Sequence, residues 1–348
     1  MSTPESRPTK STPRTGRRAG IAVVAILLGG LLVFALSRLE WSHIGHALIT
    51  ATPGWVALAL VLMALSLLLR SASWHETLHA ALPQSQSRLG WAPVARATVI
   101  GVMASALLPG RIGEPTRVLI VARRLDGPPA RLIPVLAGTV FSQTLINLLA
   151  LAILAGVSLT GVSLLHGDPA AVTAAIAVPL AICVLVLAGP RLLRQGRRSR
   201  SARVVRAAEA TARLLELARQ GLVVFARPRY GLTAVACQLL AWTLQWLACY
   251  MVVLALGLQS HAGLLTAATI LLAVNVSAIL PATPSNVGVF QAACLVVLAA
   301  YGIGAGPGLA YGIILQAVEV LTALGLGIPA LLAEGLSWRD IRSERLSP

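Results

Sequence analysis

The chain has 348 residues, of which 57% are hydrophobic and 11% are charged, and its mean hydropathy is +0.81. Soluble proteins of this length carry more charge. Repeated apolar runs of about 18 residues or more therefore indicate an all-α, polytopic membrane helical bundle. The net charge of +16 does not require nucleic acid, because basic loops between spans orient a membrane protein and contact anionic lipid. We expect membrane lipids, anionic ones above all, as partners and no nucleic acid.

Six full spans are predicted from the apolar runs. A basic tail at residues 1–19 precedes the first run without a convincing cleavage site after it, so we expect a span there and not a secretory signal. The predicted spans cover residues 20–38, 54–70, 132–156, 169–189, 231–257 and 308–333.

Two further apolar segments, 91–122 and 264–302, are interrupted by proline and glycine. Irregular backbone at membrane depth is tolerated only where protein or a water-filled cavity satisfies its polar groups. We therefore predict that each segment is a re-entrant hairpin of two half-helices inside the bundle.

The basic residues are distributed unevenly over the predicted loops. If the N-terminus is cytoplasmic, Arg38 alone of the 28 Lys and Arg residues lies toward the outside, and Arg70 falls in an inner connection. This positive-inside pattern predicts cytoplasmic N- and C-termini in the plasma (inner) membrane. Tryptophans near the two predicted boundaries fit an aromatic belt: Trp41 and Trp55 outside, and Trp74, Trp91 and Trp338 inside.

The predicted elements fall into two halves. In chain order they read span, span, hairpin, span and then again span, span, hairpin, span, with the second set inserted upside down. The first membrane half-repeat is assigned to residues 20–189 and the second to residues 231–334. The phrase "SALLPGRIGEPTR" in the first hairpin is echoed by "SAILPATPSNVG" in the second. Such an inverted repeat predicts a substrate site near the midplane, built from broken helices. The basic linker 190–230 lies on the inner leaflet or forms a soluble helix, and 335–348 is a cytoplasmic tail.

The first break has the residue types of an anion site. Proline ends one half-helix, glycines permit unusual backbone angles, and free amides at the start of the next half-helix favour an anion. Arginine is a fork-shaped phosphate binder, and Glu114 can pair with an arginine three residues away. The alternative is a cytoplasmic loop whose arginines only set topology. The candidate residues are Pro109, Gly110, Arg111, Gly113, Glu114 and Arg117.

The second break is polar but uncharged. Thr283, Ser285 and Asn286 are predicted N-caps for a helix that begins near Val287. Polar groups on apolar half-helices need partners and often face a pathway, although hydrogen bonding between helices without a substrate role is the alternative. The candidate residues are Asn275, Pro281, Thr283, Pro284, Ser285, Asn286, Gly288 and Gln291.

Three more candidates lie within predicted full spans. Glu319 is an intramembrane carboxylate, so it is expected to be a proton site or a partner of Arg111 or Arg117, with a structural ion pair as the alternative. Gln143 and Asn147 lie four residues apart and therefore share one helix face.

One metal-binding pattern occurs, "HETLH" at His75 to His79. On a helix both histidines can hold zinc with Glu76 as general base, which leaves an intramembrane zinc protease as an alternative function. No third ligand is evident, and no nucleotide-binding loop or nucleophile motif is present. We expect no catalytic residue, no metal and no other cofactor, and hence not an enzyme.

The two breaks resemble those of a flippase-like family named after the transmembrane region of lysylphosphatidylglycerol synthases. The family shows an "LPgriGE…R" element and a later "LPatPGgiGvfE" element, which read here "LLPGRIGEPTR" and "ILPATPSNVGVFQ". The resemblance covers about residues 20–335. It implies two re-entrant hairpins and movement of lipids or polyprenyl-linked lipids between leaflets. The residues that match by position are Pro109, Gly110, Arg111, Gly113, Glu114, Arg117, Pro281, Thr283, Pro284 and Gly288.

The chain departs from the family pattern at four positions. Ser285 stands where glycine is usual, Gln291 where glutamate is usual, and Gln143 and Asn147 where acidic residues are common. These changes argue against proton coupling and against a cationic headgroup. The aminoacyl-transferring domain is not expected in this chain. We therefore expect a transporter of an anionic or phosphate-bearing lipid, or alternatively a membrane scaffold for a lipid-modifying enzyme.

Overall fold

The computed structural model describes residues 51–83, 89–107, 113–126, 128–159, 222–278 and 286–335. All regular elements within these ranges are helices, which confirms the predicted fold class. They are α3 (Pro53–Ala81), α4 (Trp91–Leu107), α5 (Gly113–Ala122), α6 (Pro129–Leu159), the short 3-10 helix η3 (Leu222–Ala226), α9 (Pro228–Ala255), α10 (Leu264–Ser277), α11 (Val289–Ala300) and α12 (Ala305–Ala333).

Four of the described helices are long and apolar enough to cross a membrane: α3, α6 over Leu132–Ser158, α9 and α12. They confirm four of the six predicted spans, and the spans predicted at 20–38 and 169–189 lie outside the described residues. The predicted end of the second span at residue 70 is wrong, because α3 continues to Ala81. Its last turns are polar, but Ser71, Ser73 and Thr77 are buried against other helices and need no solvent.

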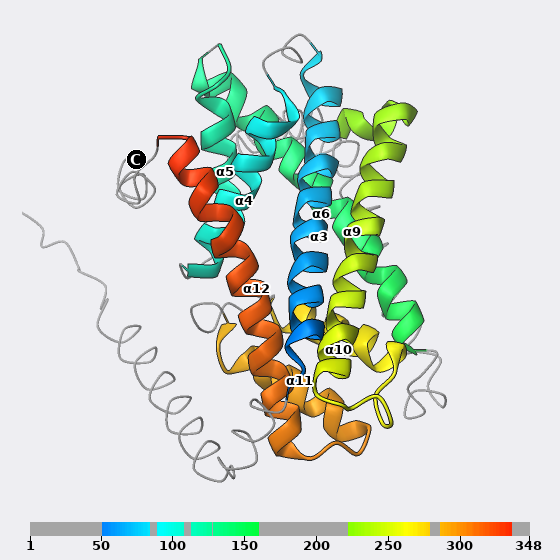
Figure 1. Cartoon of the computed structure of the whole chain (residues 1–348). Coiled ribbons are helices and arrows are strands. Elements are labelled where there is room, and N and C mark those ends of the chain that lie inside the picture. The colour runs from blue at the N-terminus through cyan, green and yellow to red at the C-terminus, as the bar shows by residue number, and fades with distance from the viewer. Residues whose placement is uncertain are drawn as a thin grey trace, which may run out of the picture.

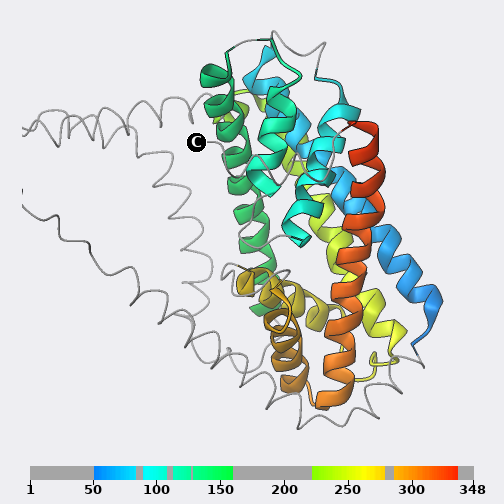
Figure 2. The same ribbon diagram turned by 90° about the vertical axis from the view of Figure 1, so that its left-hand side faces the viewer.

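Each interrupted segment is a pair of short helices, as predicted. α4 and α5 have 17 and 10 residues, and α10 and α11 have 14 and 12. All four are shorter than the roughly 20 residues that a helix needs to span a bilayer. Figures 1 and 2 show that the pairs reach into the bundle from opposite ends: α4 and α5 from the end where α12 finishes, α10 and α11 from the end where it starts. The two tips, 108–112 and 279–285, lie outside the described residues.

The most extensive helix contact joins α3 and α9, which run antiparallel side by side (Figure 1). Ser66 and Ser73 of α3 donate hydrogen bonds of 2.8 Å and 2.9 Å to the carbonyl oxygens of Ala241 and Ala234 of α9. Small residues let helix backbones approach closely. In lipid no hydrophobic force drives helices together, so close packing and hydrogen bonds of this kind hold them in contact.

Each hairpin packs against a long helix from the other part of the chain. α4 contacts α12, the last long helix of the chain, and α10 contacts α6, the long helix that follows the first hairpin. The first hairpin is itself held tightly, since the Gly113 N–H donates to Ser105 Oγ at 3.1 Å where α5 begins beside α4. A Cβ added to Gly101 would lie 2.8 Å from the Gly113 carbonyl oxygen. The two half-helices therefore touch through their backbones.

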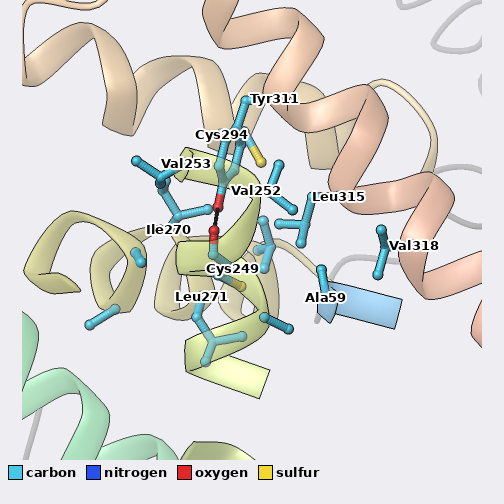
Figure 3. Close-up of a cluster of buried hydrophobic side chains, with 14 of the residues drawn as sticks. Ala59, Cys249, Val252, Val253, Ile270, Leu271, Cys294, Tyr311, Leu315 and Val318 are labelled. Atoms are coloured by element: carbon cyan, nitrogen blue, oxygen red, sulfur yellow. Dashed lines mark hydrogen bonds between the residues drawn. The ribbon is translucent and has the colours of Figure 1, made fainter. Parts of the chain in front are cut away.

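Two apolar cores lie toward opposite ends of the bundle. One gathers around the first hairpin, with Trp74, Ile100 and Val121. The other gathers around the second hairpin (Figure 3), where the Tyr311 hydroxyl donates a 2.8 Å hydrogen bond to the Cys249 carbonyl oxygen. α6 and α12 each contribute to both cores. Between these two contributions each helix carries polar residues, and the candidate site lies at this level of the bundle.

Candidate functional site

Three cavities with shared walls run between the helices. The Glu319 cavity has a volume of about 210 Å³, the two-arginine cavity about 140 Å³ and the hairpin cavity about 300 Å³. Arg70 and Leu67 line the first two, Arg117 and Glu114 line the last two, and Val102 lines all three. The remaining polar residues of the walls are Ser66, Gln245, Asn275 and Thr322 in the first, Gln143, Asn147 and Gln238 in the second, Ser105 in the third, and Thr98 and Thr144 in both the second and the third.

Arg117 is a buried cation on the second half-helix of the first hairpin, with 8% of its surface exposed. Its guanidinium pairs with Glu114 one turn earlier, as predicted, and donates a 2.7 Å hydrogen bond to Gln143 Oε1. It also lies 4.6 Å from the ring centroid of Trp74, within the range of a cation–π contact. These contacts fix the orientation of the guanidinium at the wall of two cavities.

Trp74 and Arg70 were predicted at the inner membrane boundary, and both predictions are wrong. Trp74 is fully buried, and its Nε1 donates to Thr139 Oγ1 at 3.1 Å, so it belongs to the site and not to an aromatic belt. Arg70 lies within α3, where its guanidinium donates to Gln245 Oε1 and stands 5.6 Å from the Trp242 ring. Because α3 extends beyond residue 70, both residues are carried into the bundle.

Gln143 and Asn147 share one face of α6 and line the two-arginine cavity. Gln143 Nε2 donates to the Arg70 carbonyl oxygen at 2.8 Å, so Gln143 links the two arginines. Asn147 Oδ1 accepts hydrogen bonds of 2.9 Å from Gln238 Nε2 and from Trp242 Nε1. The neutral amides thus serve as hydrogen-bonding supports for the charged residues.

Glu319 lies on α12 and faces Arg70 across the Glu319 cavity. Arg111 and Arg117 were the predicted partners of this carboxylate. Instead Arg117 is paired with Glu114, and Arg111 lies outside the described residues. Asn275, predicted from the second hairpin, lines the same cavity and donates to the Leu271 carbonyl oxygen at 2.8 Å. The second hairpin therefore reaches the cavities through α10.

The start of α11 differs from the prediction. The helix begins at Val289 with Gly288 as N-cap, whose φ is +89°, and Asn286 adopts a φ of +52° before it. A glycine has no side chain to cap with. Instead Gln291 Oε1 accepts from the Gly288 N–H at 2.7 Å, and Gln291 Nε2 donates to Gln316 of α12. Asn286, Gly288 and Gln291 line none of the three cavities, so the structure separates them from the charged site.

Seven predicted residues lie outside the described ranges. They are Pro109, Gly110 and Arg111 in the first break, and Pro281, Thr283, Pro284 and Ser285 in the second.

Comparison with known proteins identifies one family. Residues 19–327, which contain the cavities and both hairpins, match the family described as the lysylphosphatidylglycerol synthase TM region. The chain belongs to this family. No curated protein and no solved structure matches the chain. As a member of this family with four described spanning helices, the chain is an integral membrane protein.

Five residues of this family member's site were missed by sequence reasoning: Arg70, Trp74, Gln238, Trp242 and Gln245. All five lie on α3 or α9, and their roles depend on residues more than 60 positions away in the chain, as in the Arg70–Gln245 and Trp74–Thr139 pairs. The one sequence feature that could have found Arg70 was the length of the second predicted span, which is α3 in the structure. If the second span had been extended to Ala81, Arg70 would have been an intramembrane charge and so a candidate by default.

The HETLH motif lies in the last two turns of α3. His75 Nε2 and His79 Nε2 both lie 3.0 Å from the Leu89 carbonyl oxygen, and their ring centroids are 3.9 Å apart. In the described part of the chain no group of three or more His, Cys, Asp or Glu residues could hold a metal ion. The two histidines connect the end of α3 to Leu89, in the segment before α4. No observation favours the zinc protease.

A second charged cluster ties α12 to the first hairpin. Glu334, at the end of α12, accepts a 2.7 Å hydrogen bond from Arg96 of α4 and pairs with Arg124, just after α5. Burial acts to raise the pKa of Glu334, but the hydrogen bonds from the two arginines outweigh it and hold that pKa below its ordinary value. Because the folded-state pKa is lowered, ionised Glu334 stabilises the folded state above the ordinary value, and this contribution is lost as the pH falls below it.

We expect Glu334→Gln to lower the free energy of unfolding by about 1–2 kcal/mol near neutral pH, because two partly exposed charged hydrogen bonds are lost. The difference from the wild-type protein should shrink as the pH falls below the ordinary pKa of a glutamate and through the lowered pKa of Glu334, because wild-type Glu334 then becomes protonated. Thermal unfolding of the purified protein in detergent measures both effects. Glu76→Gln, which removes a carboxylate that contacts neither arginine, is the control. An equal loss at neutral and acid pH would contradict the ion-pair assignment.

Proposed function

We propose that this protein is a flippase-like transporter that moves an anionic or phosphate-bearing lipid between the leaflets of the plasma membrane, without chemical conversion of the lipid. The N- and C-termini are cytoplasmic in this proposal, in keeping with the basic residues on one side of the predicted spans. The substrate is a phospholipid or a polyprenyl-linked lipid.

The observation that carries the proposal is the buried Arg117. Its contacts with Glu114, Gln143 and Trp74 hold a guanidinium at the wall of a cavity inside the bundle. An intramembrane charge is costly and marks a substrate or ion pathway by default. Arginine binds phosphate in a bidentate manner, so a phosphate headgroup matches this site.

A neighbouring apolar cavity supports a lipid over a soluble anion. This cavity of about 350 Å³ lies between α5 and α6, and Glu114 lines both it and the hairpin cavity. Its other lining residues are all apolar: Pro115, Val118, Leu119, Ile133, Ala137 and Val140. A headgroup beside Arg117 can therefore place a hydrocarbon chain along α5 and α6.

The order of the helices supports alternating exposure of the site. A long helix, two short helices and a long helix occur in the order α3 to α6 and again in the order α9 to α12. The two short pairs reach in from opposite ends (Figure 2). In our proposal the halves are an inverted repeat, and rocking of one half against the other opens the cavities first to one leaflet and then to the other.

Leaflet-resolved lipid exchange tests the proposal. The full chain is reconstituted into vesicles that carry fluorescent phosphatidylglycerol, and a membrane-impermeant reductant quenches the outer leaflet. We expect the remaining fluorescence to decay several-fold faster than in protein-free vesicles. Equal rates would reject transport, and co-purification with a lipid-modifying enzyme would then favour the scaffold.

A further inference from the structure

The two arginines that line the two-arginine cavity each have a hydrogen-bond donor that the described residues do not use. Arg70 of α3 and Arg117 of α5 both line it, and the Nε atom of each is buried with no hydrogen-bond partner among the described residues. A buried donor that lacks an acceptor destabilises the protein unless a ligand or water supplies one. Two arginines on the wall of one cavity, each with an unsatisfied donor, are matched by an oxyanion.

The net charge around this cavity depends on whether Glu319, in the adjoining cavity, is ionised. The wall of the two-arginine cavity carries two arginines and one glutamate, Glu114, which leaves one net positive charge. Glu319 faces Arg70 from the adjoining cavity. When Glu319 is ionised, it balances the remaining charge and competes for Arg70. When it is protonated, Arg70 is available to an anion.

We propose that the two-arginine cavity is a phosphate subsite, in which Arg70 and Arg117 together hold one phosphate group and protonation of Glu319 releases Arg70 for it. This inference rests on the proposed function and deepens it. It adds Arg70 as a second phosphate-binding residue and couples lipid movement to a proton at Glu319, a site that the neutral residues Gln143, Asn147 and Gln291 do not replace. A phosphate group and a proton are taken up together and released together, and no covalent bond of the lipid changes.

The surroundings of Glu319 make Arg70 its main charged neighbour. Among the described residues, the groups that interact electrostatically with Glu319 are Arg70 on α3, Cys249 on α9 and Cys294 on α11. Neutral thiols supply no charge to compete with the guanidinium. Gln143 and Asn147, which are not titratable, occupy the α6 side of the site. The pH dependence of phosphate binding should therefore follow Glu319.

Equilibrium binding of phosphatidylglycerol to the purified full chain tests the inference, because a phosphodiester keeps one negative charge across the pH range used. We expect wild-type binding to tighten several-fold from about pH 8 to about pH 5.5, because protons then compete with Arg70 for the Glu319 carboxylate. Arg70→Gln should weaken binding about ten- to hundredfold, the size of a lost charged hydrogen bond. Glu319→Gln should bind at the higher pH as tightly as the wild-type protein does at the lower pH.

Three controls keep the test decisive. Tighter binding of Glu319→Gln is a gain that misfolding cannot produce. Arg229→Gln removes an exposed cation at the start of α9 and should bind as the wild-type protein does. Glycerophosphoglycerol carries the same phosphodiester without acyl chains. Weaker binding of it assigns the subsite to a lipid headgroup, and equal binding assigns it to a free phosphate ester, with Arg70 required in both cases.

Two results would overturn the inference: wild-type affinity in Arg70→Gln, or pH dependence that persists in Glu319→Gln. If the wild-type protein exchanges lipid in vesicles and Arg70→Gln still binds unchanged, the subsite is wrong and the transport function stands. If the wild-type protein neither binds nor exchanges lipid, both are wrong.

Discussion

Replacing Arg117 with glutamine is expected to slow the exchange of phosphatidylglycerol between leaflets at least tenfold. The substitution removes the positive charge that pairs with Glu114 and stacks on Trp74, and a charged hydrogen bond to a buried group is worth about 1.5–3 kcal/mol. Since 1.4 kcal/mol corresponds to a factor of ten, the loss of one such bond to the headgroup accounts for the expected change. The vesicle assay with fluorescent phosphatidylglycerol measures it directly.

Two matched variants separate the loss of the site from the loss of the fold. Arg117→Lys keeps the charge but lacks the planar fork, so its exchange rate should lie between those of the wild-type protein and Arg117→Gln. Arg229→Gln removes an exposed arginine and should exchange lipid at the wild-type rate. If Arg117→Gln unfolds at the same temperature as the wild-type protein and exchanges lipid as fast, Arg117 does not bind the headgroup.

Replacing Gly113 with alanine is expected to destabilise the first hairpin by about 3 kcal/mol, at the upper end of the usual overpacking range. A Cβ at this position would overlap the Gly101 carbonyl oxygen and the Ser105 Oγ. Since the first of these is a backbone atom, α4 and α5 have to separate to make room. The hydrogen bond from the Gly113 N–H to Ser105 is then lost as well. Thermal unfolding in detergent, together with the lipid exchange rate, measures the effect.

Gly325→Ala is the matched control for this prediction. Gly325 lies within α12, and a Cβ there would meet no atom within 4 Å. Alanine is the better helix former by about 1 kcal/mol, so this variant should be as stable as the wild-type protein or slightly more stable. A Gly113→Ala protein with wild-type stability would show that α4 and α5 do not touch at this point.

Hydropathy and helix breakers predicted much of the fold. The four described long helices and the two interrupted segments follow from runs of apolar residues and from the prolines and glycines that end them. The Glu114–Arg117 pair was also predictable, because residues three apart are neighbours on any helix. These features depend on residues close together in the chain.

Other features were decided by contacts between distant segments. The end of α3 was misplaced because its polar residues find partners on α9 and α6, and the start of α11 was misplaced because Gln291, not a residue before the helix, caps the Gly288 N–H. Glu319 faces Arg70 for the same reason: the pairing depends on how α12 packs beside α3.

The sequence by itself therefore determined that this is a helical membrane protein with two broken segments and charged residues at the first break. The tertiary structure decided that Arg70 and Gln245 join Arg117 and Gln143 around connected cavities, and that Trp74 stacks against Arg117. The physical reason is that local sequence sets hydrophobic length and helix breaks, whereas a buried charge takes whichever partner the packing of the helices brings within a few ångströms.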